Sequence, residues 1–360
     1  MDPIRLSVAH AHGSYDVVVG EGVLHQLPTL LAAAGLTPAP VVISCPPVWR
    51  AHGRVLEPVM DGREPLLMAD GERAKTLGSV ARLYEGLVKA GADRKTPVIA
   101  FGGGVVGDVA GFAAASFLRG LPVVQIPTTL LAQVDSSIGG KTGVNLPAGK
   151  NLVGAFHAPS LVVCDPAVLR TLPRREFRAG LYEAIKYGVI ASRPLFDRIA
   201  RDLDALFARQ EAPLADMIAA CCRIKADVVM ADEHEHGQRR ILNFGHTAGH
   251  ALESITRYRR YRHGEAVGLG MLAAAELAVA RGALHADDRD ALRDLITRMG
   301  PMPATTDLRV EDALTAMGRD KKVAAGRLHY VLPVGIGETL IVDDVTREEL
   351  GRALQAIGLQ

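Results

Sequence analysis

The sequence predicts an α/β fold with two domains, an N-terminal domain with a parallel sheet over residues 1–172 and a mainly α-helical domain over residues 173–360. Up to about residue 170, short runs rich in β-branched residues alternate with helical stretches, which is typical of βαβ units. After Pro173 the strand signal nearly vanishes and helical periodicity dominates. A glycine-rich run that follows one of the predicted strands adds a nucleotide-loop candidate to the first domain.

The elements of the first domain follow from these patterns. The N-terminal twenty residues alternate apolar and polar side chains, which predicts a hairpin. One long amphipathic stretch predicts a helix, and four apolar runs predict strands that pair in parallel. The predicted helix is 73–90, and the predicted strands are 41–44, 97–101, 122–127 and 160–165.

The second domain is predicted to be helical with a small strand pair near its end. The helices are expected at 176–190, 195–208, 213–231, 246–257, 264–282, 287–299 and 345–357. The short strands are expected at 327–333 and 338–342. No long linker separates the two halves, so we expect them to pack directly and to form a cleft.

Composition excludes several classes of partner. Lys+Arg (41) and Asp+Glu (40) nearly balance, so no global charge would attract nucleic acid or an anionic membrane surface. The longest apolar stretch, 97–118, contains five glycines and Asp108, which a lipid-facing helix does not tolerate well. We expect no signal peptide, since the N-terminus lacks a basic start before an apolar core. Four cysteines without a Cys-x-x-Cys pattern fit a reducing cytoplasm.

The nucleotide-loop candidate is the run 102–108, which contains Gly-x-Gly-x-x-Gly between a predicted strand and a predicted helix. Glycines let the backbone approach a pyrophosphate, and the helix N-terminus supplies amide hydrogens. A tight strand–helix turn is the alternative, and no acidic residue stands in 122–127, about 20 positions on, where the dinucleotide fingerprint has one. Hydroxyls at 128–129 and polar loops at 135–142 and 149–151 favour a ligand site, although solvated turns would have a similar composition.

A metal site is indicated by Glu183, His246 and His263. His246 and His250 are four residues apart and share one face of a predicted helix, as zinc-binding pairs do. The alternative is that one or both of these histidines form hydrogen bonds within the core. Glu183 lies in an apolar helix, one turn before Lys186, and a buried acid there needs a partner that a metal would supply. Such a site leaves a fourth position open for water or substrate.

These motifs identify a family. The strings GGGVVGDVAGFAAASFLRG, IPTTLLAQVDSSIGGKTGVN, GKNLVGAFHAP, EAIKYG, GQRRILNFGHTAGHALE and HGEAVGLGM occur in the order and spacing of the 3-dehydroquinate synthases. The chain resembles this family from about residue 66 to 335. The resemblance implies a Rossmann-like nucleotide-binding domain, a helical metal-binding domain, a homodimer, and the cofactors NAD and Zn2+, with Co2+ a possible substitute.

The resemblance also implies roles for individual residues. Glu183, His246 and His263 would bind the metal, while His250 would contact substrate, and Arg119 would reach the phosphate in the neighbouring subunit's site. The other residues of the substrate pocket would be Asp135, Lys141, Asn151, Lys186, Lys225, Arg239, Asn243 and one or both of Lys321 and Lys322. The cofactor contacts would be Glu72, Lys75, Gly103, Gly104, Val105, Asp108, Thr128, Thr129, Leu131, Lys150, Thr171, Leu172 and Glu176.

The implied reaction converts an anionic sugar phosphate, 3-deoxy-D-arabino-heptulosonate 7-phosphate, to 3-dehydroquinate and phosphate in the shikimate pathway. Oxidation at C5 by NAD, phosphate elimination, reduction and an intramolecular aldol step would follow one another. The alternatives are another sugar phosphate cyclase, a metal- and NAD-dependent polyol dehydrogenase, and a binding protein without activity. Intact metal and cation motifs argue against the last of these.

The sequence departs from the family pattern at two positions. Ser44 stands after an early strand where the family usually has an aspartate for the adenosine ribose. A serine cannot accept hydrogen bonds from two ribose hydroxyls as a carboxylate can, so cofactor affinity and selection against a 2′-phosphate are expected to change. Tyr182 replaces an expected small residue, with no evident consequence for mechanism.

Overall fold

The computed structural model describes residues 2–235, 237–318, 323–324 and 327–360, so Lys321 and Lys322 lie outside the described residues. The chain forms two compact units, Met1–Pro173 with Phe207–Glu233, and Arg174–Leu206 with His234–Gln360. This partition differs from the single division predicted after residue 172. The segment 207–233 groups with the first unit because its helix packs against the N-terminal hairpin.

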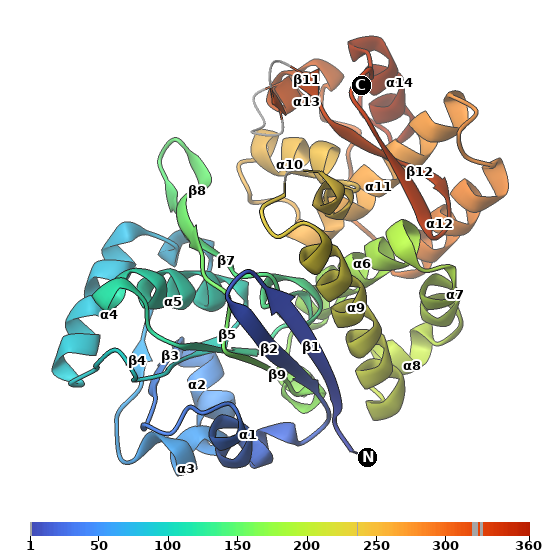
Figure 1. The fold of residues 1–360 in the computed structure, drawn as a ribbon. Coiled ribbons are helices and arrows are strands. Elements are labelled where there is room, and N and C mark those ends of the chain that lie inside the picture. Colours follow the sequence, from blue (N-terminus) through green and yellow to red (C-terminus); the bar gives the residue numbers. More distant parts are fainter. Residues whose placement is uncertain (1, 236, 319–322, 325–326) are drawn as a thin grey trace. The chain divides into compact units, whose positions relative to one another are not determined.

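The first unit is built on a seven-stranded sheet with the order β1-β2-β9-β6-β5-β3-β4 (Figure 1). β1 and β2 form the predicted antiparallel hairpin, and every other neighbouring pair in this sheet is parallel. The predicted α/β class with a parallel sheet is therefore confirmed. The strands are β1 (Ile4–His10), β2 (Gly13–Val19), β3 (Val41–Ser44), β4 (Leu66–Leu67), β5 (Val98–Gly102), β6 (Val123–Pro127) and β9 (Leu161–Cys164).

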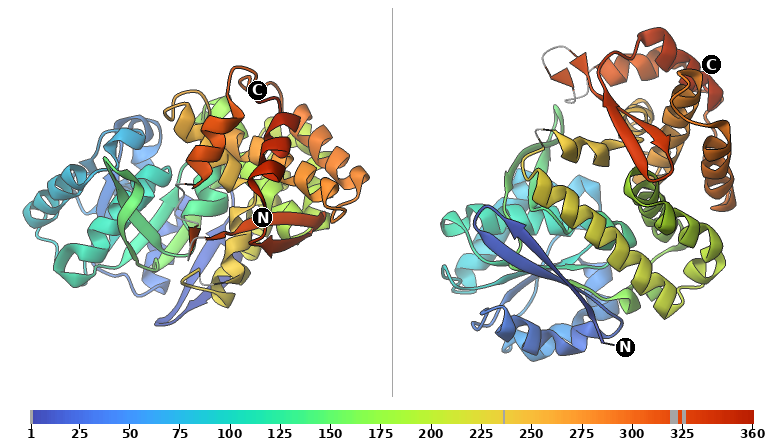
Figure 2. Two further views of the ribbon diagram at one scale, coloured as in Figure 1. Left: turned by 90° about the horizontal axis from the view of Figure 1, so that it is seen from above. Right: turned by 45° about the vertical axis from the view of Figure 1, so that its right-hand side comes forward.

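Helices cover both faces of this sheet, which explains why its central strands are buried throughout and mostly apolar. Every residue of β3, β5, β6 and β9 is buried, as expected for parallel strands with two covered faces. α4 (Leu77–Lys89) and α5 (Gly104–Ser116) pack on the face that carries Ile43 and Ala100. α1 (Leu27–Ala33), α2 (Pro46–His52) and α3 (Glu57–Met60) lie on the other side (Figure 1). α9 (Glu211–Ala231) runs beside β1 and β2 (Figure 2).

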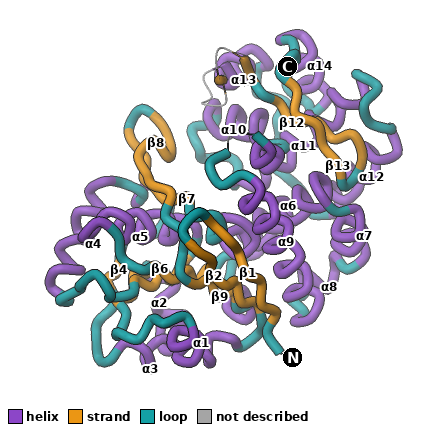
Figure 3. Tube along the Cα trace, in the orientation of Figure 1, coloured by secondary structure: helices purple, strands orange, loops and turns teal. Residues whose placement is uncertain are grey.

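A second hairpin in the first unit corrects the sequence prediction. The polar segments 135–142 and 149–151 were expected to be loops, but Lys141–Leu146 (β7) and Gly149–Phe156 (β8) pair as antiparallel strands (Figure 3). Their glycines lower strand propensity, so the local pattern resembles turns. Pairing depends on close backbone approach instead, since a Cβ added at Gly154 would lie 2.1 Å from the Thr142 carbonyl oxygen.

The second unit is mainly helical, with one small sheet of β12 (Tyr330–Gly335) and β13 (Glu338–Val342). Of the predicted helices, 195–208 is broken at Asp202 into two, and 310–318 is a helix that the sequence did not predict. No helix among the described residues combines the length and apolarity needed to span a bilayer. The remaining elements are α6 (Arg174–Ala191), α7 (Arg193–Arg201), α8 (Leu203–Phe207, which reaches the unit boundary), α10 (His246–Ile255), α11 (His263–Ala280), α12 (Ala286–Arg298), α13 (Val310–Gly318), α14 (Arg347–Ala356), β10 (Val323–Ala324) and β11 (Arg327–Leu328).

Candidate functional site

Two helices of the second unit, α10 and α11, cross closely enough to bring their histidines together. A Cβ added at Gly270 of α11 would lie 1.8 Å from the carbonyl oxygen of Gly245, so only glycine permits this crossing. Gly245 itself has φ +76, in the left-handed region that glycine adopts readily, and α10 begins at the next residue. The glycines of the NFGHTAGH and GLGM strings therefore set the position of the first turn of α10.

Three imidazoles meet where α10 and the start of α11 approach each other. The ring centroids of His246 and His263 are 5.1 Å apart, and those of His246 and His250 are 5.4 Å apart. One ligand nitrogen from each of the three histidines lies within 4.8 Å of the others. From α6, the Oε1 atom of Glu183 lies 3.7 Å from His246 Nε2 and 3.5 Å from His263 Nε2. The structure therefore brings together the four residues that the sequence singled out around the metal.

The surroundings of the Glu183 carboxylate suit a residue that binds a cation. Its side chain is fully buried, yet neither carboxylate oxygen accepts a hydrogen bond from any described residue. Lys186 Nζ lies 2.6 Å from Glu183 Oε2, but this contact lacks hydrogen-bond geometry and leaves Oε1 facing the two imidazoles. A buried carboxylate without hydrogen bonds is costly unless a cation compensates it. Two imidazoles and one carboxylate form a donor set that suits zinc and leaves a coordination position open.

The Nδ1 atom of each proposed ligand histidine, His246 and His263, also lies close to a hydrogen-bond acceptor. His246 Nδ1 lies 3.1 Å from the carbonyl oxygen of Phe244, and His263 Nδ1 lies 3.1 Å from Glu253 Oε2. A carbonyl oxygen can only accept, so Nδ1 of His246 carries the hydrogen and its Nε2 offers a lone pair. Glu253 was not among the predicted site residues, although it lies seven residues after His246 and therefore on the same face of the helix.

A buried carboxylate, Glu265, holds the first turn of α11 in place. Arg175 and Arg178 of α6 both donate to it, at 2.7–2.8 Å, and it accepts a hydrogen bond from the backbone amide of Arg262. Burial opposes ionisation of this group, but the hydrogen bonds from Arg175, Arg262 and Arg178 outweigh it, so the pKa of Glu265 is lowered. Glu265 thereby anchors the helix end that bears His263, a role that the sequence analysis did not identify.

Tyr182, the unexpected residue in α6, fills space left by a glycine. A Cβ added at Gly268 would lie 2.9 Å from Tyr182 Cδ1, so the ring packs on α11 where a larger neighbour would clash. Its hydroxyl has no hydrogen-bond partner among the described residues, and burial raises the pKa of Tyr182 to about 12. The tyrosine is accordingly a packing residue between α6 and α11.

Three other predicted site residues also lie in the second unit. Arg239 is almost fully buried within 238–243. Asn243 donates from Nδ2 to Glu235 Oε1 at 2.8 Å. Glu176, predicted to contact the cofactor, forms an ion pair with Arg262 at 2.7 Å.

In the first unit, three predicted segments meet at the carboxyl ends of β5 and β6. β5 ends at Gly102, and α5 starts two residues later, as the glycine-rich motif predicts. A Cβ added at Gly103 would lie 2.9 Å from Thr129, and one at Gly104 would lie 3.0 Å from Ser136. Ligands of open α/β sheets bind at this edge, next to helix N-termini. Val105 follows in the first turn of α5, and Leu131 directly precedes the π-helical turn 132–136.

Polar groups at this edge of the sheet are arranged around the α5 N-terminus. Lys75 forms an ion pair with Asp108 on α5, and burial raises the pKa of Asp108 while Lys75 opposes the rise. The backbone amide of Thr128 donates to Gly102, but its hydroxyl is buried without a partner among the described residues. An unpaired buried hydroxyl costs about 1–3 kcal/mol, so a ligand that pairs with it would be favoured.

Predicted substrate residues of the first unit take part in two separate hydrogen-bonded groups. Lys225 of α9 donates to Asp135, which confirms that α9 contributes to this unit. Asn145 of β7 donates to Glu72 at 2.7 Å and accepts from the amide of Asn151 at 2.9 Å. The hairpin that carries Lys141, Lys150 and Asn151 is thus tied to the segment that carries Glu72 and Lys75. Asn145 is a connecting residue that sequence analysis missed.

The hydrogen bond of Ser44 shows what this residue does at the end of β3. Ser44 is fully buried, and its hydroxyl donates to the Phe101 carbonyl at 2.7 Å, so it serves the sheet. The next residue, Cys45, contacts the carboxylate of Asp70, and burial together with this carboxylate raises the pKa of the Cys45 thiol. Asp70 is exposed. The structure thus places an acid beside β3, one strand further along the sheet edge, which the sequence analysis did not identify.

Three further predicted residues belong to the first unit. Thr171 pairs with His52 at 2.7 Å, and the carbonyl of Leu172 accepts a hydrogen bond from Arg209. Arg119 is exposed in a short turn after α5 and has φ +69.

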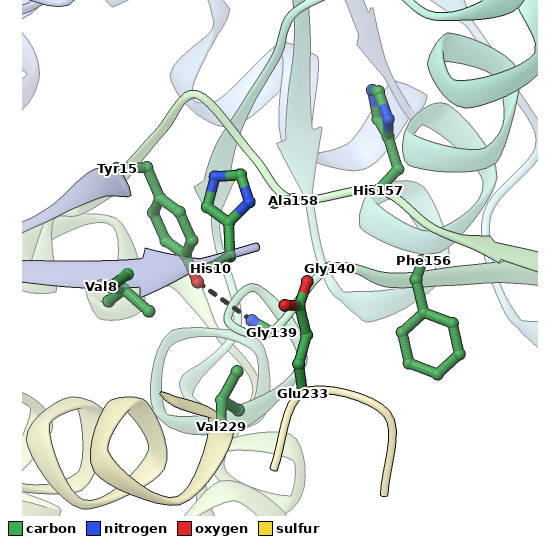
Figure 4. A pocket seen from close by; sticks show the side chains of 11 residues that line it. Val8, His10, Tyr15, Gly139, Gly140, Phe156, His157, Ala158, Val229 and Glu233 are labelled. Carbon is green, nitrogen blue, oxygen red and sulfur yellow. Dashed lines mark hydrogen bonds between the residues drawn. The ribbon is translucent and has the colours of Figure 1, made fainter. Parts of the chain in front are cut away.

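A small pocket in the first unit is lined by residues that were not predicted as site residues. It is lined by the hairpin β1–β2, by the segment 139–140, by the end of β8 and by the end of α9 (Figure 4). The hydroxyl of Tyr15 accepts a hydrogen bond from the Gly139 amide at 3.1 Å across it. None of its lining residues is a predicted metal, substrate or cofactor contact.

Comparison with known proteins gives a consistent result. Residues 65–179 match the family model described as 3-dehydroquinate synthase N-terminal, and residues 180–323 match 3-dehydroquinate synthase C-terminal. A 3-dehydroquinate synthase from Thermosynechococcus vestitus is 47% identical over 355 residues, covering 96% of each chain.

Two solved structures resemble the whole chain. One is ValA, a 2-epi-5-epi-valiolone synthase from Streptomyces hygroscopicus with NAD+ and Zn2+ bound, with a TM-score of 0.86, 29% identity and coverage of 97% and 98%. The other is a 2-deoxy-scyllo-inosose synthase in complex with carbaglucose-6-phosphate, NAD+ and Co2+. It also has a TM-score of 0.86, with 27% identity and coverage of 98% and 99%.

Proposed function

Because the chain belongs to the 3-dehydroquinate synthase family, we propose that it converts 3-deoxy-D-arabino-heptulosonate 7-phosphate to 3-dehydroquinate and phosphate. The observation that carries this proposal is the buried Glu183 carboxylate, which faces two imidazole nitrogens and accepts no hydrogen bond from the described residues. This arrangement suits a catalytic divalent metal in an enzyme whose family acts on an anionic sugar phosphate. The enzyme is then a phosphate-eliminating lyase of the shikimate pathway.

The residues would divide the work between two cofactors and the substrate. Glu183, His246 and His263 would hold Zn2+ or Co2+, which when bound lowers the pKa of a coordinated hydroxyl. Residues around 102–108 and 128–129 would hold NAD, which when bound accepts a hydride and returns it. The lysines and arginines named from the sequence would bind the carboxylate and phosphate of the substrate, because a chain of net charge +1 cannot attract an anion globally.

Two related functions are less well supported. Sugar phosphate cyclases that make cyclitols share the fold at 27–29% identity, whereas the synthase from Thermosynechococcus vestitus is 47% identical. Polyol dehydrogenases do not require so many cations around the substrate, and glycerol dehydrogenases resemble this chain only in fold, at 16% identity.

A stoichiometry measurement tests the reaction. Purified enzyme with metal and NAD, given 3-deoxy-D-arabino-heptulosonate 7-phosphate, is expected to release one phosphate per carbocycle formed, without net NADH, because the hydride returns to the substrate. Phosphate is measured by a coupled colorimetric assay, the carbocycle by chromatography and NADH by absorbance. Stoichiometric NADH accumulation would contradict the proposal and favour a dehydrogenase, and turnover only of a substrate without a carboxylate would favour a cyclitol-forming enzyme.

The position of Asp70 leads to a prediction for cofactor recognition. We propose that Asp70 accepts hydrogen bonds from the adenosine ribose, because Ser44 is committed to Phe101 and Asp70 lies beside Cys45 at the same sheet edge. Asp70→Asn is expected to weaken NAD+ binding by roughly tenfold, the lower end for a charged hydrogen bond, and to change NADP+ binding much less. Calorimetric titration of both nucleotides measures this, with the exposed Glu64→Gln as control. Equal weakening of both nucleotides would contradict selection by Asp70.

We also propose that the protein forms a homodimer and that it is cytoplasmic. A homodimer would supply Arg119 to the neighbouring active site, and the left-handed conformations of Leu118 (φ +50) and Arg119 (φ +69) support a fixed, functional turn there. A cytoplasmic location is supported by the cysteines, since all four are buried and none forms a disulfide bond.

A further inference from the structure

One face of α10 presents three polar side chains toward the start of α11. His246, His250 and Glu253 stand at positions i, i+4 and i+7, which share a helix face. His246 and His250 lie within 5.1–5.8 Å of the His263 ring, measured between centroids, and Glu253 Oε2 lies 3.1 Å from His263 Nδ1. Glu253 thus approaches His263 from the side opposite to the proposed metal ligand atom.

The contact between Glu253 and His263 determines which ring nitrogen carries the lone pair. Glu253 is 5% exposed, and a buried carboxylate accepts hydrogen bonds to offset lost hydration. With a hydrogen on His263 Nδ1 donated to Glu253, the lone pair lies on Nε2, the atom 3.5 Å from Glu183 Oε1. His246 has the same arrangement through a different acceptor, the carbonyl of Phe244. Both rings therefore present Nε2 to the Glu183 carboxylate.

We propose that Glu253 is a positioning residue that sets the tautomer and orientation of His263 and thereby the affinity and coordination of the bound metal. Its carboxylate also polarises the imidazole, which makes Nε2 a better donor to a cation. The acceptor for His246 is a backbone carbonyl, which a substitution cannot remove. The acceptor for His263 is the Glu253 side chain, which a substitution can remove. The role rests on the proposed function, because it requires that His263 bind a metal.

The decisive variant is Glu253→Gln, which keeps the shape of the side chain and removes its charge. We expect the affinity for Zn2+ and for Co2+ to fall about 10- to 100-fold, the usual effect of losing such a partner. Competition of metal-free protein with a chromophoric chelator measures this without substrate or NAD. The visible absorption of the Co2+ form is expected to shift as well, since the orientation of His263 relaxes. Glu253→Asp, which keeps the charge on a shorter side chain, is expected to bind metal more tightly than Glu253→Gln. This second variant keeps the test informative if Glu253→Gln does not fold.

A matched control separates positioning from general stability. Glu276 is also a carboxylate of the second unit, located on α11 and held by Arg289 and Arg293. Glu276→Gln is expected to lower the melting temperature of the metal-free protein and to leave its metal affinity and Co2+ spectrum unchanged. The same pattern in Glu253→Gln, a lower melting temperature with unchanged metal affinity, would overturn the positioning role.

Two further results would also overturn it, and they differ from each other. Complete loss of metal in Glu253→Gln, equal to that of His263→Ala, would make Glu253 a ligand. If the unsubstituted protein bound no Zn2+ or Co2+ in the same titration, the proposed function itself would fail and this role with it. A weakened but retained metal in Glu253→Gln, with normal binding in Glu276→Gln, supports the proposal.

Discussion

His263→Ala is expected to leave the protein without tightly bound metal and without measurable turnover. His263 Nε2 lies 3.5 Å from Glu183 Oε1, in line with a shared cation, and its removal leaves His246 and Glu183 as two of three ligands. Because metal affinity falls steeply with ligand number, we expect a loss of roughly a hundredfold or more. Elemental analysis after dialysis, together with the phosphate-release assay, gives metal content and activity on the same sample.

Two control variants test whether loss of the metal is specific to His263. His250 lies in the same cluster, and its nitrogen is within 4.8 Å of those of His246 and His263, so geometry alone permits a three-histidine site. If Glu183 is the third ligand, His250→Ala keeps the metal and loses activity. His285→Ala, an exposed histidine at the start of α12, is expected to behave as the unsubstituted protein. Full metal content in His263→Ala, or loss of metal in His250→Ala alone, would contradict the assigned ligand set.

The fold could be predicted where the local pattern and the final environment agree. The strands β3, β5, β6 and β9 are buried at every position and mostly apolar because helices cover both sheet faces, and such apolar runs can be recognised in a single sequence. The hairpin β7–β8 could not be found in this way. Its strands are glycine-rich and gain their stability from pairing with each other, and such pairing leaves little trace in residue type. Helix α9 was located correctly, but its grouping with the first unit depends on contacts with β1 and β2, which are distant in sequence.

The candidate site, like the fold, could be predicted only where residue type and spacing indicate the role of a side chain. A metal cluster could be predicted from the chemistry and spacing of four side chains, those of Glu183, His246, His250 and His263. Glu253 and Glu265 carry no such signal, since a glutamate in a helix is common on any solvated face. Their burial decides their role, and burial arises from the crossing of α6, α10 and α11. Ser44 shows the reverse case, because its type suggested a weakened cofactor contact, whereas its hydrogen bond to Phe101 assigns the hydroxyl to the sheet.

A mixture of two impaired variants is expected to exceed the activity of either variant alone if the active sites are shared between subunits. Arg119→Ala is expected to weaken substrate binding by about 1.5–3 kcal/mol, the range for hydrogen bonds between charged groups. Lys186→Met removes a buried cation, 1% exposed and 2.6 Å from Glu183, within the other chain's own site. In a heterodimer of the two variants, one site combines an intact Lys186 with an intact Arg119 from the partner, and the other site carries both defects. Equal mixing with random exchange then restores about one quarter of the unsubstituted activity, as two-fold symmetry requires.

The result depends on which chain supplies each residue, so a second pair of variants serves as the control. Lys186 and His250 both belong to the second unit of one chain. Mixing Lys186→Met with His250→Ala therefore leaves one defect in every site, and no recovery is expected. Different affinity tags on the two chains establish that heterodimers form. With exchange shown in this way, failure of the Arg119→Ala and Lys186→Met mixture to exceed either parent at any ratio would defeat the shared-site proposal, because Arg119 would then act within its own chain or not at all.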